Sequence, residues 1–316
     1  MSKDIRGVDE YMINLAKSHV TDLIPDIISY IANSGGKRLR PILTLACAKI
    51  CRCSTEDHVL LAAAVEFIHT ATLLHDDVID QSKLRRNRKT ANNIWGDKAS
   101  ILVGDYLFSQ AFKLMVKTSS LEALETLSNA AATIAESEVW QLQLIEQVGI
   151  TQQDYMNLVT SKTAALFAAA CKVGGIAANA EQDIVSAFYE FGLNFGIAFQ
   201  IIDDLLDYFG NSNEFGKEIG NDFLEGKVTL PIILAFSEAC DDEKELLHRS
   251  FSGSVRDMTS FAAIIEVLVR QNIFEKIQEV AAFYAQSALS ALNNIRELEH
   301  VSLLQDIVLY TLRRRV

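Results

Sequence analysis

Residues 54–81 read STEDHVLLAAAVEFIHTATLLHDDVIDQ, a run without proline or glycine. Apolar residues recur in it at spacings of three and four: Leu60, Ala64, Phe67, Ala71 and Leu74. This is the periodicity of the buried face of an α-helix. The run ends on a cluster of aspartates, so it predicts a long packed helix with an acidic end.

The rest of the chain shows the same helical character. Residues 105–147 and 254–316 also lack proline and glycine, and strand-like alternation is scarce. We expect helices near 20–33, 39–51, 55–80, 98–117, 120–147, 152–172, 180–209 and 228–240 and several more to the end, with polar loops at 81–97 and 210–227. Ser54 is a predicted helix cap, and Thr151 with Asp154 resembles a capping box. No repeat or linker divides the chain, so we expect one all-α helical domain over residues 1–316.

Composition narrows the class of protein. The chain has 316 residues, of which 49% are hydrophobic, and a formal net charge of −12, which argues against nucleic acid as a partner. Five cysteines without a Cys-x-x-Cys pair favour reduced thiols. We expect no signal peptide behind the charged residues Lys3, Asp4 and Arg6, and no apolar run approaches the ~18 residues of a spanning helix. A soluble, cytoplasmic protein is the prediction.

Two aspartate clusters are the most informative feature. Asp76, Asp77 and Asp80 end the first helix, and Asp203, Asp204 and Asp207 lie near the end of another. In each cluster the outer aspartates are four apart, hence about 40° apart around a helix. Oxygen-only ligands of this kind suit Mg²⁺. A solvated acidic helix end explains one cluster as well as a metal does, but two clusters in apolar helices favour metal binding.

Basic residues gather in motifs that suit phosphate. Gly35-Gly36-Lys37-Arg38-Leu39-Arg40-Pro41 enters a helix, and Arg85-Arg86-Asn87-Arg88-Lys89 follows the first aspartate cluster. Lys37 and Arg40 can share a helix face, from which Arg38 diverges. Further cations are Lys162, beside Thr163, and Lys217 and Lys227. Arginine and lysine bind phosphate oxygens, and although a single basic patch is ordinarily solvated surface, its pairing with carboxylate clusters favours an anionic substrate.

Taken in this order, the motifs resemble those of the trans-isoprenyl diphosphate synthases, specifically the long-chain polyprenyl (octaprenyl and decaprenyl) type. The matching segments are 35–41, 76–80, Arg85-Arg86, Lys162-Thr163, Gln200 with 203–207, and 216–227. The resemblance implies a helical bundle of the isoprenoid synthase type around a central elongated cavity. It also implies a Mg²⁺-dependent homodimeric prenyltransferase, with three Mg²⁺ ions when substrate is bound. Isopentenyl diphosphate would be added to an allylic primer of the farnesyl or geranyl type, giving a ubiquinone side-chain precursor.

The resemblance also implies a role for each motif residue. Asp76, Asp80 and Asp203 would ligate Mg²⁺, with Asp77 and Asp207 as further ligands or support. Arg85, Lys162 and Lys217 would bind the allylic diphosphate, and Lys37, Arg40, His69 and Arg86 the isopentenyl diphosphate, with Lys227 a further substrate-binding residue. Thr163 and Gln200 would steady the allylic cation. His69 lies seven residues before Asp76, about 20° away on the same stripe, although a lone histidine on a helix is more often a core residue.

Two positions bear on product length and loop shape. Ala71 and Thr72 precede Asp76 by five and four residues, where aromatic residues signal short products in this family. Their small size implies a product of about eight to ten isoprene units, although ordinary helix packing accounts for them equally well. Asn87 stands where the family has glycine, and because asparagine tolerates a left-handed backbone we expect the loop to survive.

Ionisation of an allylic diphosphate needs no protein nucleophile, and no triad-like arrangement is evident. Two alternatives stay open. A terpene cyclase ionises the same substrates but typically lacks a second full aspartate cluster and the isopentenyl-binding cations. A non-catalytic subunit of a heteromeric synthase usually has eroded aspartates. Handover of an apolar product at a membrane surface is a further expectation.

Overall fold

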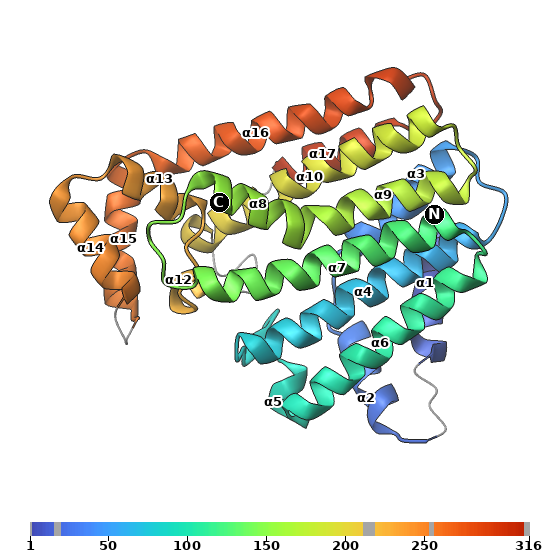
Figure 1. The fold of residues 1–316 in the computed structure, drawn as a ribbon, viewed down its shortest axis with the longest axis horizontal. Helices are drawn as coiled ribbons and strands as arrows, with labels where there is room; N and C mark the ends of the chain where they lie inside the picture. The colour runs from blue at the N-terminus through green and yellow to red at the C-terminus, as the bar shows by residue number, and fades with distance from the viewer. Residues whose placement is uncertain (1, 16–19, 211–218, 253–255, 313–316) are drawn as a thin grey trace. The chain divides into compact units, whose positions relative to one another are not determined.

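The computed structural model describes residues 2–15, 20–210, 219–252 and 256–312, and over these it is built from helices with a single two-stranded hairpin (Figure 1). The α-helices are α1 (Ser2–Leu15), α2 (Leu23–Ala32), α3 (Leu39–Ile50), α4 (Asp57–Ile79), α5 (Ala91–Trp95), α6 (Asp97–Lys117), α7 (Leu121–Leu144), α8 (Gln152–Val159), α9 (Ala165–Ala177), α10 (Gln182–Phe209), α12 (Asn221–Leu224), α13 (Leu230–Glu238), α14 (Asp241–Ser252), α15 (Met258–Arg270), α16 (Ile273–Ala291) and α17 (Ser302–Leu312). A π-helix, η1 (Thr160–Ala164), precedes α9, and a 3₁₀ turn, η2 (Asn293–Ile295), follows α16. The all-α prediction is confirmed.

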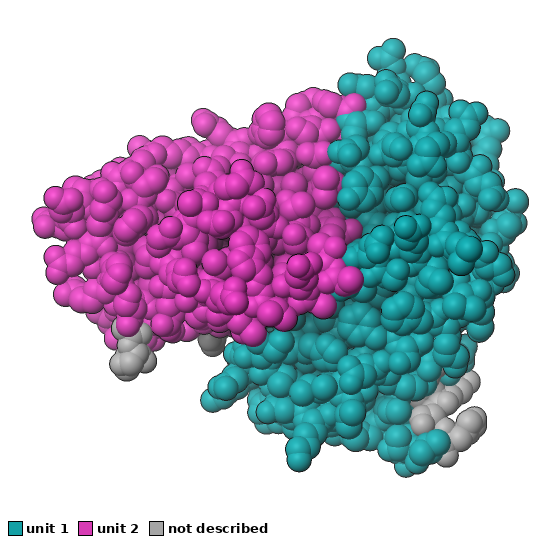
Figure 2. Space-filling model, in the orientation of Figure 1, with its two compact units in different colours: residues 1–131, 166–192, 291–305 teal, residues 132–165, 193–290, 306–316 magenta. Residues whose placement is uncertain are grey.

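The chain forms two compact units, coloured separately in Figure 2. Unit 1 comprises residues 1–131, 166–192 and 291–305, and unit 2 comprises residues 132–165, 193–290 and 306–316. The single domain over residues 1–316 and its central cavity stay predictions.

Helix α4 is the core of unit 1, where it packs against α6, α3 and α1. Its predicted face is buried, since Ala64, Phe67 and Ala71 are 0% exposed and Leu74 is 2% exposed. Ala62 and Ala63 are buried as well, so the helix is enclosed on more than one side, as expected of a central helix. By length and composition, α4 and α10 are both apolar enough to cross a membrane. The most apolar window of α4 is 61% buried inside the structure and that of α10 is 50% buried, and burial of this kind explains the apolar character of α4.

The predicted loop at 81–97 contains regular structure. Strands β1 (Leu84–Arg85) and β2 (Arg88–Lys89) pair antiparallel through the two-residue turn Arg86-Asn87, and α5 follows. Both turn residues have positive φ, 54° and 58°, as a type I′ hairpin turn requires. Asn87 therefore adopts the left-handed backbone that was expected of it.

Two details of the predicted helices are corrected. Ser54 does not cap α4; the N-cap is Glu56, without a side-chain hydrogen bond, and the Thr55 hydroxyl accepts from the Asp57 amide at 3.4 Å. The helix expected over 152–172 is divided into α8, η1 and α9, because the backbone widens to a π-helix at 160–164. The capping box of Thr151 and Asp154 is confirmed.

Unit 2 has its own apolar core. Phe223 of α12 contacts Phe251 of α14 and Phe261 of α15, with ring centroids 5.3 and 5.8 Å apart. Helices α13, α14 and α15 pack against one another, and α8 packs on α13 (Figure 1). Aromatic burial thus holds α12, which lies inside the loop predicted at 210–227, against the C-terminal helices.

Candidate active site

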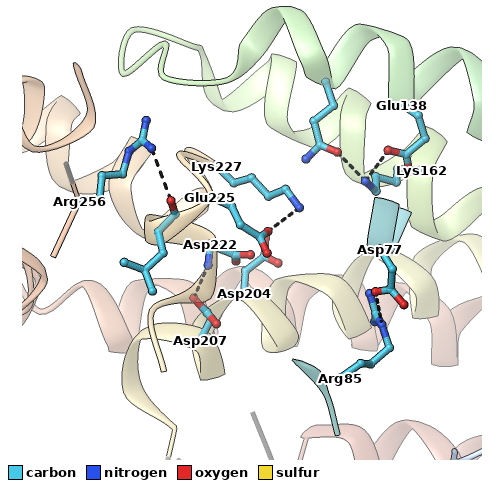
Figure 3. A network of polar contacts seen from close by, with 12 residues as sticks. Asp77, Arg85, Glu138, Lys162, Asp204, Asp207, Asp222, Glu225, Lys227 and Arg256 are labelled. Carbon is cyan, nitrogen blue, oxygen red and sulfur yellow. Dashed lines mark hydrogen bonds and ion pairs between the residues drawn. The ribbon is translucent and has the colours of Figure 1, made fainter. Parts of the chain in front are cut away.

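The first aspartate cluster closes α4 in unit 1. Asp76 and Asp80 are half-buried, and Asp80 is the C-cap residue. Asp77 is 5% exposed, and its Oδ1 accepts a hydrogen bond of 2.9 Å from Arg85 Nε on the hairpin (Figure 3). Asn92 of α5 also donates to the Asp77 carbonyl at 3.1 Å. The middle aspartate therefore ties the helix end to the hairpin and to α5, which favours a supporting role over direct metal ligation.

The glycine turn before α3 brings a second group of cations to the hairpin. Gly35 and Gly36 have φ of 75° and 156°, and the guanidinium of Arg86 donates to the Gly35 carbonyl. A Cβ on Gly36 would lie 2.8 Å from Arg86 Nη1, so a larger residue there would displace the guanidinium from the Gly35 carbonyl. The motifs at 35–41 and 85–89, far apart in sequence, thus meet.

Arg38 is the cation of this turn that faces the protein. It takes a left-handed backbone, with φ of 47°, as N-cap of α3. Its Nη1 lies 2.5 Å from Oε1 of Glu66, which is 4% exposed, and its Nε lies 3.6 Å from Asp9. Desolvation raises the pKa of Glu66, and the charge and hydrogen bond of Arg38 oppose that rise. Arg38 is a structural cation, which accords with its predicted divergence from Lys37 and Arg40.

Arg40 and His69 lie together. Arg40 Nη1 is 3.3 Å from His69 Nε2, and its guanidinium carbon is 4.1 Å from the ring centroid of Phe167, a cation–π distance. Desolvation, and then the charges of Arg40, Arg85 and Arg86, hold the pKa of His69 well below its ordinary value. The imidazole is neutral at pH 7 as a result.

Several cationic side chains lie close together in this part of unit 1. Desolvation, followed by Arg85 and Arg38, lowers the pKa of Arg86 below the ordinary value of a guanidinium, while Glu66 opposes the shift. Groups of like charge in such proximity repel, and a bound anion relieves the repulsion. Unit 1 therefore offers a site for a multiply charged anion such as a diphosphate.

The second aspartate cluster lies on the part of α10 that belongs to unit 2. Asp204 is 5% exposed, and both of its carboxyl oxygens are used: Gln200 Nε2 donates to Oδ1 at 2.6 Å and Tyr155 Oη donates to Oδ2 at 2.6 Å. Asp207 Oδ2 accepts from the amide of Asp222 at 3.0 Å and so holds the start of α12. Asp203, which directly precedes Asp204, is half-buried.

Burial has a consequence for Asp204. Desolvation, and then the charge of Asp222, raise its pKa to about 8, against the opposing hydrogen bonds of Tyr155 and Gln200. The ionised form of Asp204 is thus disfavoured in the metal-free protein, and a nearby cation would stabilise it.

A cavity of about 130 Å³ in unit 2 collects most of the remaining predicted residues. Among its lining residues are Lys162, Thr163, Gln200, Asp204, Asp222 and Lys227. Lys162 Nζ lies 2.7 Å from Glu138 and 2.5 Å from Gln141, and Lys227 Nζ lies 2.7 Å from Glu225 (Figure 3). The π-helix places Lys162 and Thr163, a backbone irregularity that is frequent at functional sites.

The structure separates the predicted residues into these two groups. Unit 1 holds Lys37, Arg40, His69, Arg85, Arg86 and the first aspartate cluster, and unit 2 holds Lys162, Thr163, Gln200, Lys227 and the second cluster. Lys217 lies outside the described residues. Of the chain-length positions, Ala71 is fully buried, and Thr72 is half-buried with its hydroxyl donating to the His69 carbonyl at 2.8 Å.

Several site residues escaped the sequence prediction. Tyr155 and Glu138 carry no motif, although Tyr155 precedes Lys162 by seven residues and so shares its stripe of the helix. Asp222 lies inside the matching segment 216–227, but the sequence predicted no role for it. These three become visible only through their contacts with Asp204, Lys162 and Asp207.

The donor set fits a hard divalent cation. Over the described residues, no three His, Cys, Asp or Glu side chains converge closely enough to hold a metal ion by themselves. Mg²⁺ ordinarily keeps several waters and takes one or two carboxylates together with substrate phosphate oxygens. The half-buried pair Asp76 and Asp80, and Asp203 in unit 2, have the right chemistry for that mode.

Comparison with known proteins places these features in a family. The polyprenyl synthetase family model matches residues 21–268. The chain is 38% identical over 292 residues to the octaprenyl diphosphate synthase of Escherichia coli (strain K12), covering 92% of this chain and 90% of that protein. A crystal structure of a decaprenyl diphosphate synthase from Rhodobacter capsulatus is 41% identical, with a TM-score of 0.93 over 100% of this chain and 97% of that one. A polyprenyl synthase from Caulobacter crescentus CB15, solved with calcium and isoprenyl diphosphate, is 39% identical, with a TM-score of 0.95 over 100% and 96% of the two chains.

Proposed function

The chain belongs to the polyprenyl synthetase family, and from that premise we propose that it is a long-chain trans-polyprenyl diphosphate synthase. The predicted family, the isoprenoid synthase type of fold and the prenyltransferase class are confirmed. Relatives named for octaprenyl and decaprenyl products support the predicted length of about eight to ten isoprene units. The apolar product would serve as the side chain of a quinone such as ubiquinone.

One observation carries the proposal. The pocket of unit 2 combines two lysines, five neutral oxygen-bearing side chains, the buried Asp204 and the half-buried Asp222, and no residue lining it is arranged as an activated nucleophile. Such a lining suits a reaction in which a diphosphate departs and leaves a carbocation. It does not suit acyl transfer.

In the reaction, the carbon–oxygen bond of the allylic diphosphate breaks and a carbon–carbon bond forms to isopentenyl diphosphate. Lys162 and Arg85 bind the departing diphosphate and stabilise its developing charge. The oxygens of Thr163 and Gln200 face the cation, and the proton lost from the new allyl group leaves with the released diphosphate. Mg²⁺ ions, three with substrate bound, held by Asp76, Asp80 and Asp203, would add Lewis-acid stabilisation of the leaving group.

The second substrate would bind in unit 1. Lys37, Arg40 and Arg86 supply three cations from two motifs, and neutral His69 adds a hydrogen bond. Desolvation and then the neighbouring arginines lower the pKa of Arg86 and His69, and a bound isopentenyl diphosphate would relieve the repulsion between these cations.

The test is an assay of the purified chain alone with Mg²⁺, isopentenyl diphosphate and farnesyl or geranyl diphosphate. Mass spectrometry of the dephosphorylated product should show a prenyl alcohol of about eight to ten units. A small cyclic hydrocarbon would indicate a terpene cyclase instead. Absence of turnover would indicate a subunit that needs a partner chain.

Homodimerisation is part of the proposal. Helix α6 exposes several apolar side chains, with Leu102 at 66%, Phe112 at 42% and Val116 at 63%, on a face that also carries Asp105 and Ser109. Burial of these apolar side chains against a second copy would remove them from water. Light scattering at assay concentration should give twice the chain mass, and Val116→Asp should reduce it toward the monomer.

We also propose a cytoplasmic enzyme that releases product at a membrane surface. Leu84 at 56% and Ile94 at 43% exposure lie in the segment 81–97, where Lys83 and Lys89 are exposed as well. Apolar and basic residues together favour an anionic bilayer. Co-sedimentation with anionic vesicles, lost at high salt and absent with neutral vesicles, is the expected result.

A further inference from the structure

A continuous chain of hydrogen bonds runs beneath the pocket of unit 2. Tyr155 Oη donates to Asp204 Oδ2 at 2.6 Å, Gln200 Nε2 donates to Asp204 Oδ1 at 2.6 Å, and Thr163 Oγ1 donates to Gln200 Oε1 at 2.9 Å. Tyr155 and Asp204 are 2% and 5% exposed, whereas Gln200 is half-buried. All four side chains line the pocket, and Thr163 is 8% exposed, so Gln200 is the most exposed member of the chain.

This chain decides which way the amide of Gln200 faces. An amide presents a donor on one side and an acceptor on the other, and either orientation fills the same space. With Asp204 Oδ1 accepting, the NH₂ group turns toward the carboxyl group and the carbonyl oxygen turns toward Thr163. Thr163 must then donate its proton to that oxygen, which leaves the lone pairs of its own oxygen available to the pocket.

Asp204 can fix the direction of the Gln200 amide only if a second contact holds its own carboxyl group in place. Its carboxyl group can rotate about the bond to the side-chain methylene, and the bond from Tyr155 to Oδ2 holds the group in plane with Gln200. Tyr155 is positioned in turn by α8, whose capping box fixes the first turn, with Thr151 and Asp154 bonded in both directions. Tyr155 and Asp204 both line the pocket, and the phenol is connected to Gln200 through Asp204.

We propose that Tyr155 and Asp204 are positioning residues that orient the Gln200 carbonyl and the Thr163 hydroxyl toward the allylic cation. The inference rests on the proposed function. Both residues are almost fully buried in the pocket wall, and their role is to set the direction of the two dipoles of Gln200 and Thr163. Preorganised dipoles cost no reorganisation when the charge develops, so loss of their orientation lowers the rate of ionisation rather than the affinity for diphosphate.

Tyr155→Phe removes the hydroxyl and keeps the ring. We expect kcat to fall about tenfold, which corresponds to about 1.4 kcal/mol, with KM for both diphosphates unchanged. Tyr208→Phe is the matched control, because Tyr208 is 3% exposed in the same unit but its hydroxyl lies outside this chain of bonds. Its kcat should equal that of the wild type. Far-UV circular dichroism and melting temperature establish that each variant is folded at the assay temperature.

A double-mutant cycle separates positioning from general loosening. If Tyr155 acts through Gln200, Tyr155→Phe should cause no further loss in a Gln200→Ala background. If Tyr155→Phe folds poorly, Asp204→Asn tests the same chain of hydrogen bonds. The loss of kcat in Asp204→Asn should likewise disappear in a Gln200→Ala background.

Wild-type kcat in Tyr155→Phe, or a tenfold loss that persists unchanged with Gln200→Ala, overturns the inference. Failure of the proposed function gives a different result, because the wild-type chain would then make no long prenyl product at all.

Discussion

Within the motif at 35–41, Arg38 stabilises the fold through its ion pair with Glu66, whereas Lys37 is proposed to bind substrate. Arg38 Nη1 and Glu66 Oε1 are 2.5 Å apart, and the two side chains are only 15% and 5% exposed. Removal of one partner of a buried pair leaves a charge without compensation and costs about 3–5 kcal/mol. Because Arg38 keeps some contact with water, we expect Arg38→Met to lower the free energy of unfolding by about 3 kcal/mol, near the lower end of that range. Methionine keeps the packing of the aliphatic stem.

The pH dependence gives an internal check. Desolvation already raises the pKa of Glu66, and Arg38 restrains the rise, so in Arg38→Met the folded-state pKa climbs further. Between the unfolded value of about 4.3 and that raised value, the folded state binds a proton that the unfolded state does not. The free energy of unfolding therefore increases as pH falls through this window. Arg38→Met should be less destabilised at pH 5 than at pH 7.

Urea denaturation in metal-free buffer, at both pH values, measures these effects. Adding Glu66→Gln to Arg38→Met should restore much of the loss at pH 7, since the buried charge is then gone. Lys37→Met is the matched control: its side chain is exposed, so stability should change by less than about 0.5 kcal/mol, while KM for isopentenyl diphosphate rises. A loss in Arg38→Met that is equal at both pH values and unrelieved by Glu66→Gln would refute the reasoning.

Three further predictions concern the aspartates and the product. Asp76→Ala or Asp203→Ala should reduce kcat by about 10² or more with unchanged helical circular dichroism, and near-normal turnover in both would contradict their role as Mg²⁺ ligands. Ala71→Phe should shift the chromatographic product profile to shorter chains and, because Ala71 is fully buried, lower stability by about 1–3 kcal/mol; an unchanged profile would remove Ala71 from length control. The folded-state pKa of Asp204 is about 8, which is above its unfolded value. In metal-free protein, the free energy of unfolding should therefore fall by up to about 1.4 kcal/mol per pH unit as pH rises toward 8, and it should level off above pH 8. Asp204→Asn should abolish that slope in urea titrations, and a slope identical to wild type would contradict the shift.

Local pattern was sufficient for the helical architecture. The spacing from Leu60 to Leu74 predicted the buried face of α4, and the interval 105–147, which lacks proline and glycine, contains all of α7. The helices predicted at 98–117 and 180–209 agree with α6 and α10 to within a few residues of their bounds. These features depend on interactions between residues three and four apart, so the sequence contains them directly. The motifs and their order likewise identified the family, because the motifs contain the residue types that the family's chemistry needs.

The roles within each motif depend on contacts that sequence spacing does not contain. Asp76 and Asp77 are neighbours in one cluster, yet Asp77 is buried and accepts a hydrogen bond from Arg85, whereas Asp76 is half-buried. Asp203 and Asp204 differ in the same way, because Asp204 is buried and accepts from Tyr155, which is distant in sequence, whereas Asp203 is half-buried. Desolvation and partner distance decide which carboxylate is a support and which stays available to a cation, and both arise only when helices pack. The sequence by itself determined the helices, the family and the kinds of residue at the site; the tertiary structure alone assigned each charged group its partner.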